Sequence, residues 1–156
     1  EVWMSESKKA RRVLLRTLRR AEAEKMLARN HVGHIAFSFH DRISIEPIHY
    51  VYDSEWLYGR TTYGEKVRMI EHHPWIAFEV EEIEDLFNWR SVVVKGTFYV
   101  MGSDTSKNEQ LAFERCVALM RAAVPEVLAE DDPTPFRQQL FRIHLDEVSG
   151  RESSMG

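Results

Sequence analysis

The alternation of apolar and polar positions predicts a mainly β protein with helices at its flanks. Positions 34–39 place Ile35, Phe37 and Phe39 on one face of a strand, and positions 43–52 return as a second strand after a turn. Further strands are expected at 56–61, 75–80, 89–101 and 140–145, and helices at 21–29, 64–73 and 108–128. Short consecutive strands of this kind favour an antiparallel sheet that closes into a barrel, with the helices packed outside.

Two details of this pattern carry structural expectations. Ile43 and Ile45 are apolar at odd positions whereas Ile48 and Tyr50 are apolar at even ones, which predicts a bulge or bend at Glu46 and Pro47. The strand 89–101 has a nearly continuous apolar middle, which predicts burial on both faces. The acid-rich stretch 79–85 is interpreted as a solvated loop.

The N-terminal 20 residues are expected to stand apart from the domain that spans residues 21–151, with residues 152–156 as a tail. Between Lys8 and Arg20 there are seven Lys or Arg residues and no acid, with Val13, Leu14 and Leu18 at helical spacing. Such a basic amphipathic helix could bind nucleic acid or a membrane surface, or lie solvated on the protein or on a second subunit. The second interpretation is favoured because the segment is short and has no aromatic residue to stack on a base.

Composition narrows the class of protein. A chain of 156 residues with 44% hydrophobic and 29% charged residues is expected to form one globular domain. The net charge of −4 argues against nucleic-acid binding by the whole molecule. One cysteine, Cys116, cannot form an internal disulfide, which fits a reducing cytoplasm. No apolar run of membrane-spanning length and no signal-peptide core are found in the sequence.

Candidate chemistry is concentrated between Pro47 and Pro74. Two cations and two hydroxyls, Arg60, Thr61, Thr62 and Lys66, precede or begin the short helix. Unpaired N–H groups at a helix start, the helix dipole and nearby cations all favour a phosphate. Either cation alone would more simply be a surface charge paired with a neighbouring glutamate, but the combination favours a phosphate site.

Other motifs are absent from the sequence or weak. The adjacent His72 and His73 point in different directions on a helix, and no acid or cysteine cluster supports them as metal ligands. No GxGxxG fingerprint of a nicotinamide-binding unit occurs, and no Ser-His-Asp or Cys-His arrangement can be argued. No catalytic residue is assigned.

The segments PIHYVYD, WLYGRTTYGEKVRMIEHHP, WRSVVVKG and LFRIHLDEVSGR, in this order, resemble the pyridoxamine 5′-phosphate oxidase-like flavoproteins, in the branch that includes the nitroimidazole-reductase (Nim) proteins. The resemblance implies an FMN-binding split β-barrel, usually a homodimer, with the flavin site at the subunit interface. It implies that the FMN phosphate is held by Arg60, Thr61, Thr62 and Lys66. It further implies that the isoalloxazine ring is lined by Pro47, Ile48, His49 and Tyr50, and that the site is closed by Trp89, Arg90 and Ser91.

One position departs from the family pattern. Many Nim-like proteins have a histidine where this chain has Arg60, and an arginine cannot exchange a proton near neutral pH. The expected function is therefore that of an FMN-dependent oxidoreductase acting on a small organic substrate, without commitment to nitroimidazoles. Two alternatives stay open at this point: a flavin-binding or regulatory module without turnover, and a heme-handling protein on the same fold.

Overall fold

The computed structural model describes residues 11–102 and 106–156. In this part of the chain the elements are β1 (Val13–Thr17), α1 (Arg20–Arg29), β2 (Val32–Phe39), β3 (Arg42–His49), β4 (Val51–Asp53), β5 (Trp56–Thr61), α2 (Glu65–His72), β6 (Trp75–Ile83), β7 (Trp89–Val100), α3 (Lys107–Ala123) and β8 (Gln139–Met155). None of these helices is long and apolar enough to cross a membrane.

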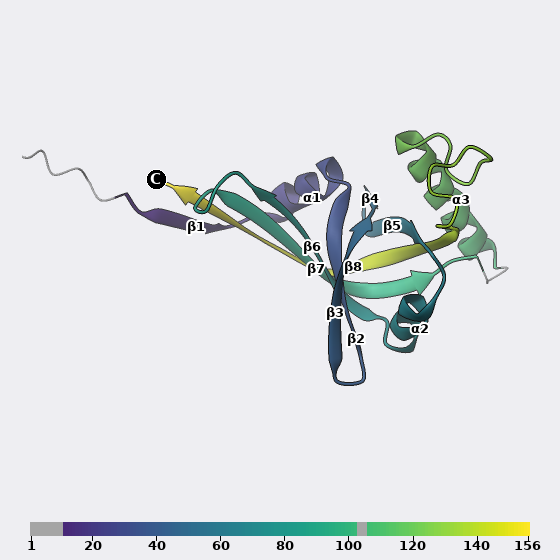
Figure 1. Ribbon diagram of the computed structural model, residues 1–156. Coiled ribbons are helices and arrows are strands. Elements are labelled where there is room, and N and C mark those ends of the chain that lie inside the picture. The colour runs from purple at the N-terminus through teal and green to yellow at the C-terminus, as the bar shows by residue number, and fades with distance from the viewer. Residues whose placement is uncertain (1–10, 103–105) are drawn as a thin grey trace, which may run out of the picture.

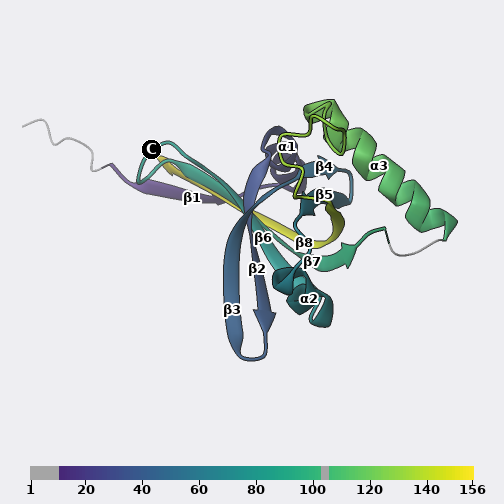
Figure 2. The same cartoon turned by 45° about the vertical axis from the view of Figure 1, so that its right-hand side comes forward.

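All eight described strands belong to one antiparallel sheet in the order β3-β2-β6-β7-β8-β5-β4, with β1 on the free side of β8. One end of the sheet curls into a barrel-like body with α2 and α3 outside it (Figure 1). The other end, formed by β1 and the adjoining ends of β6, β7 and β8, extends as an arm (Figures 1 and 2). The predicted mainly β fold with antiparallel strands and flanking helices is confirmed.

Two apolar clusters hold the body together. The larger cluster fills the inside of the curled sheet and includes Leu57, Phe78 and Phe141, none of them more than 1% exposed. α1 closes this cluster with Met26 and Leu27, both fully buried. The smaller cluster lies between α3 and the outer face of β5 and β8. Burial of each such side chain contributes about 1.5–3 kcal/mol, so the outer helix is anchored by packing.

The irregular point of the sheet lies between β7 and β8, where Asp146 of β8 is the extra residue, and the bulge predicted at Glu46 and Pro47 is wrong. The register between β7 and β8 shifts between Lys95 and Gly96. The ladder between β2 and β3 runs regularly along the whole of β3. Ile43 and Ile45 are 82% and 68% exposed, so they lie on the outer face without any break in the strand. The sequence argument failed because it assumed that every apolar residue faces the core.

The N-terminal segment contains a strand where a helix was predicted. Residues Val13–Thr17 pair with residues 151–155 of β8, from Val13↔Met155 to Thr17↔Arg151. An exposed sheet edge offers unpaired N–H and C=O groups, and this pairing satisfies them along five residues. Part of the predicted helix, residues 8–10, lies outside the described residues. Residues 152–155 of the predicted tail belong to β8, which continues to Met155, and the predicted division of the chain into domains stays a prediction.

Three smaller differences concern element limits and burial. The acidic stretch is partly strand, because β6 continues to Ile83. β7 is not buried on both faces: Val92 and Val94 are buried while the residue between them is half-buried. α3 ends at Ala123 rather than at 128, since Pro125 disfavours the helical conformation in the residue before it.

Candidate functional site

The residues predicted to form the site lie in three places. Pro47–Tyr50 form the end of β3 and the residue after it, Arg60–Lys66 run from β5 into the first turn of α2, and Trp89–Ser91 begin β7. Lys66 Nζ of the second group forms an ion pair, at 2.8 Å, with Oε2 of Glu46, the residue before the first group, and His49, Tyr50 and Arg60 line one cavity. The start of β7 lies in the arm, away from α2 (Figures 1 and 2). One chain therefore brings two of the three groups together.

The start of α2 has the features of an anion site. Its N-cap is Gly64, which supplies no side-chain cap, so the first N–H groups of the helix are left for another acceptor. Lys66 lies in this first turn, with a side chain 29% exposed, and the Glu46 carboxylate that it contacts is 42% exposed. Ion pairs this exposed contribute only about 0–1 kcal/mol, so an incoming anion can compete with Glu46 for the ammonium group.

Of the two threonines, Thr62 is exposed and Thr61 is buried. Thr62 donates from Oγ1 to the main-chain oxygen of Phe136 at 3.2 Å. Its hydroxyl thus lies at the surface beside α2, where it can exchange this contact for a ligand.

Arg60 forms an ion pair with an acidic residue of the segment after α3. It is 7% exposed, and its Nη1 and Nη2 donate to the two carboxylate oxygens of Asp132 at 2.5 and 2.8 Å. Nη2 also donates to Thr134 Oγ1 at 2.7 Å. Arg60 and the N–H groups of Thr134 and Leu128 hold the pKa of Asp132 well below its usual range, because all of them stabilise the carboxylate. The structure shows Arg60 fastening the segment after α3 to β5, and its role as a phosphate ligand stays a prediction.

The sequence analysis missed Asp132. The two residues of this pair are 72 positions apart, and Asp132 stands in a loop without any recognisable motif. The DDPTP composition predicts only a turn, and nothing local indicates which cation the carboxylate meets.

The end of β3 presents its two faces to different surroundings. Ile48 and Tyr50 are 7% and 2% exposed and lie in the core, so only their main chain can meet a ligand. The Tyr50 hydroxyl donates to the main-chain oxygen of Leu27 at 2.7 Å. Pro47 and His49 lie on the opposite, exposed face. Partial burial lowers the pKa of His49, and the positive charges of nearby arginines lower it further, so the neutral form of its imidazole is favoured.

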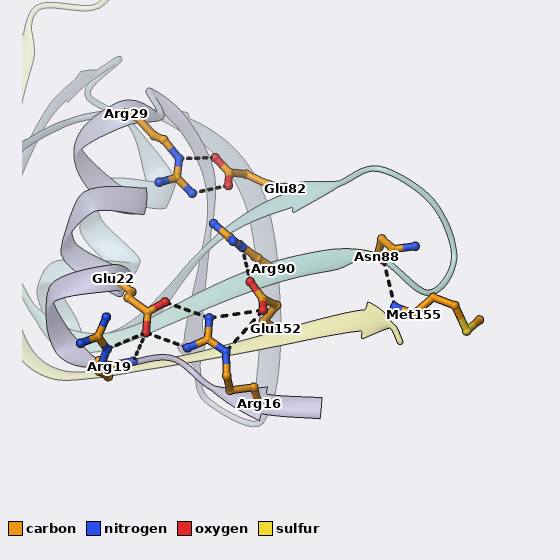
Figure 3. A network of polar contacts seen from close by, with 9 residues as sticks. All are labelled: Arg16, Arg19, Glu22, Arg29, Glu82, Asn88, Arg90, Glu152 and Met155. Atoms are coloured by element: carbon orange, nitrogen blue, oxygen red, sulfur yellow. Dashed lines mark hydrogen bonds and ion pairs between the residues drawn. The ribbon is translucent and has the colours of Figure 1, made fainter. Parts of the chain in front are cut away.

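In the arm, Arg90 belongs to a network of charges that links β1, α1, β7 and β8 (Figure 3). Its Nε contacts Glu152 Oε2 at 2.5 Å. Glu152 also contacts Arg16 at 3.3 Å, and Arg16 contacts Glu22 at 2.8 Å. Desolvation alone would raise the pKa of Glu152, but the hydrogen bonds and charges of Arg90 and Arg16 stabilise its carboxylate, and the net result is a lowered pKa. Arg90 thus ties the arm to α1 within its own chain.

The other two residues of this group, Trp89 and Ser91, are half-buried. Trp89 borders two hollows of about 350 and 410 Å³ on the arm. Ser91 Oγ donates to Glu79 Oε2 at 3.0 Å. Because the Trp89 ring borders these two hollows, another molecule can contact it.

No metal centre is found in the described part of the chain, where no three His, Cys, Asp or Glu side chains gather closely enough to hold an ion. His72 ends α2, and its ring lies 5.6 Å from that of Phe39 in an edge contact. A place at the helix C-terminus accounts for this histidine.

An antiparallel split barrel with helices outside defines the class of protein. The sequence model of the pyridoxamine 5′-phosphate oxidase family matches residues 19–152. The chain therefore belongs to the pyridoxamine 5′-phosphate oxidase family, and the predicted resemblance is confirmed.

Several solved structures share the fold. A FAD-binding protein from Mesorhizobium loti is 27% identical, with a TM-score of 0.73 over 90% of this chain and 99% of that chain. A proposed 5-nitroimidazole antibiotic resistance protein from Bacteroides thetaiotaomicron is 10% identical, with a TM-score of 0.66 over 94% of each chain. HutZ, the heme storage protein from Vibrio cholerae, is 14% identical, with a TM-score of 0.65 over 88% of this chain and 96% of that chain. The last two show likeness of fold alone, and a comparison with curated proteins gives no match.

Proposed function

We propose that the protein is a flavoprotein that binds FMN and exchanges electrons with a small organic molecule. Membership of the family and the likeness to a FAD-binding protein support a flavin. The observation that carries the proposal is the start of α2, where an uncapped helix terminus and Lys66 lie next to the end of β3. FMN ends in a phosphate dianion, which this combination favours.

The contacts within this chain suggest which residues would bind each part of FMN. Lys66, Thr62, Thr61 and the first N–H groups of α2 would hold the phosphate. The main chain of residues 47–50 would line the ring, because the side chains of Ile48 and Tyr50 are committed to the core. Arg60 would act indirectly, since both its Nη atoms are already taken by Asp132.

When bound, the flavin supplies the electron or hydride transfer, and the protein binds and orients it. The chain offers little acid–base chemistry near the ring. The Arg60 guanidinium is paired with Asp132. The lowered pKa of His49 favours its neutral form, which is a weaker acid than the imidazolium ion. Substrates that need a protein proton donor are therefore not expected.

We further propose that two copies form a symmetric dimer in which Trp89, Arg90 and Ser91 of each copy complete the other's site. This is supported by the distance of β7's start from α2 within one chain (Figures 1 and 2) and by the ring of Trp89, which borders open hollows. In a twofold arrangement both sites are completed at once. Flavin occupancy is expected to fall on dilution into monomers, and a stable FMN-loaded monomer would contradict this arrangement.

The first test is the visible absorption spectrum of freshly purified protein, followed by denaturation and chromatography of what is released. Flavin bands with FMN in the supernatant are expected. Released FAD would revise the cofactor, a Soret band would favour heme handling, and a colourless protein that fails to bind added FMN would overturn the proposal. Reduction of the bound flavin by a nicotinamide cofactor and reoxidation by an organic acceptor, without oxygen, separate an enzyme from a binding module.

The second test is the substitution Lys66→Ala. It should weaken the binding of FMN by roughly tenfold or more, as expected for the loss of one charge-assisted hydrogen bond, and leave the affinity for riboflavin almost unchanged. Arg68→Ala is the matched control, because Arg68 is an exposed cation on the same helix whose charge lies 5.8 Å from the ring of Tyr63. Equal losses for FMN and riboflavin would contradict the phosphate assignment.

A further inference from the structure

A second candidate site lies behind the end of β3, on the outer side of the sheet. A cavity of about 480 Å³ is bounded by the β3–β4 junction, the C-terminal end of α3 and the segment 133–137. This volume lies within the range of pockets that hold small organic ligands, about 300–1,000 Å³. We call it the α3 cavity.

The walls of the α3 cavity are mostly apolar. The apolar side chains come from β4, from the end of α3 and from the turn after it: Val51, Met120, Ala123, Val124 and Val127. The surface they provide matches the body of a hydrocarbon or aromatic ligand.

Four of the polar residues of the cavity are basic. His31, His49, Arg60 and Arg137 all line it. Arg60 is neutralised by Asp132. The oxygens of Asp132 are already shared among that guanidinium and the N–H groups of Leu128 and Thr134, at 2.5–2.9 Å. This carboxylate is thus not available to another cation.

Arg137 is in a different position. Its main chain accepts from Arg60 and donates to Thr134, and its guanidinium lies 5.8 Å from the ring of Phe136. Across residues 11–102 and 106–156, no carboxylate forms an ion pair with it. The field of this charge reaches His49, whose pKa it lowers together with partial burial and Arg60.

We propose that the α3 cavity binds an organic carboxylate with an aromatic or aliphatic body, with the carboxylate on Arg137 and the body against the end of α3. A guanidinium presents two parallel N–H donors that match a carboxylate, and the apolar walls supply the rest of the contact. The cavity borders the proposed ring position, because His49 and Tyr50 also line it. The contacts proposed for the carboxylate nevertheless use Arg137 and the end of α3, and none of them uses the start of α2.

The test compares 2-naphthoate with 2-naphthamide by isothermal titration calorimetry on the protein as purified. The two probes have nearly the same shape and differ in charge. The carboxylate is expected to bind roughly tenfold or more tightly than the amide, as one charge-assisted pair provides. Equal affinities, or no binding of either probe, would overturn the proposal.

Two variants locate the site. Arg137→Gln should remove the preference for the carboxylate, whereas Arg68→Gln, an exposed cation on α2, should leave it unchanged. Ala123→Phe should weaken both probes, because Ala123 is an exposed residue at the end of α3 and a larger ring there enters the cavity. Undiminished binding in Ala123→Phe, with an unchanged circular dichroism spectrum, would place the ligand elsewhere and overturn the proposal.

The same titration in saturating FMN separates this proposal from the preceding one. Naphthoate should bind with unchanged affinity, and failure of FMN to bind would leave the naphthoate result intact. Mutual displacement of FMN and naphthoate would mean that the cavity belongs to the flavin itself, and would overturn the separate site.

Discussion

Replacement of Tyr50 by phenylalanine tests whether the end of β3 serves a ligand through its main chain or through its side chains. The Tyr50 side chain is 2% exposed, and its hydroxyl donates to the Leu27 oxygen at 2.7 Å. Leu27 lies in the last turn of α1, where carbonyl groups have no partner within the helix. Asn30 caps another of them, donating from Nδ2 to the Met26 oxygen at 2.9 Å. Tyr50→Phe therefore leaves one buried carbonyl without its donor.

The cost follows from that unsatisfied acceptor. Loss of such a hydrogen bond reduces the free energy of unfolding by about 1–2 kcal/mol. For a domain of this size each kcal/mol corresponds to about 2–4 °C, so the melting temperature should fall by about 2–8 °C. Desolvation raises the pKa of Tyr50, in agreement with a buried neutral hydroxyl. Flavin affinity should stay within about twofold of the unsubstituted protein, because the hydroxyl points away from the proposed ring position.

The assay is thermal and urea unfolding of the two proteins, with an FMN titration of each. Tyr52→Phe is the matched control, because Tyr52 is half-buried and its hydroxyl makes no hydrogen bond to the described residues. An unchanged melting temperature in Tyr50→Phe would refute the capping role. A large loss of flavin affinity with normal stability would show instead that the side chain meets the ligand.

Three further predictions concern the stability of the fold and the burial of its residues. Gly96→Ala should lower the free energy of unfolding in urea by about 1–3 kcal/mol, because a Cβ there would lie 1.9 Å from a main-chain oxygen of β8. Gly64→Ala is the control and should lower it much less, since a Cβ there has nothing within 4 Å, and equal losses would contradict the packing argument. The guanidinium of Arg29 lowers the pKa of Glu82 to about 2. The pair therefore stabilises the fold fully above the unfolded carboxyl pKa near 4.5, and this stabilisation is lost as the pH falls toward 2. Arg29→Gln should flatten the dependence of the free energy of unfolding on pH between these two values, and an unchanged dependence would contradict the prediction. Burial raises the pKa of Cys116 to about 12, so the native thiol should resist Ellman's reagent at pH 8 and react after unfolding, and rapid reaction of folded protein would show that α3 opens.

Local patterns were sufficient where an element depends on its own residues. α1 ends at Arg29 with Asn30 as its C-cap, and α2 begins after Gly64, both close to the predicted limits. β2 alternates as expected, since Ile35 and Phe37 face the core. The turn at Ser54 has a φ of 59°, a conformation typical of a tight hairpin connection.

Elements that depend on a distant partner could not be recognised in this way. Val13, Leu14 and Leu18 recur at helical spacing, yet residues 13–17 form a strand because the edge of β8 lies beside them. All five are exposed, so no core-facing alternation could have indicated the strand. Ile43 and Ile45 show the converse problem, as apolar residues on an outer face carry no mark that distinguishes them from core residues.

The sequence by itself determined the fold class and the family, and it predicted an anion site at α2, because each depends on residues close together in the chain. The tertiary structure decided which charges are free. Arg60 and Lys66 look equivalent in the sequence, yet Arg60 is buried against Asp132 and Lys66 holds a partly exposed pair with Glu46. Arg137 attracted no notice in the sequence, and the fold leaves it at a cavity without a carboxylate partner among the described residues. Coulombic and hydrogen-bond energies depend on distance and burial in space, and these are properties of the folded chain rather than of residue spacing.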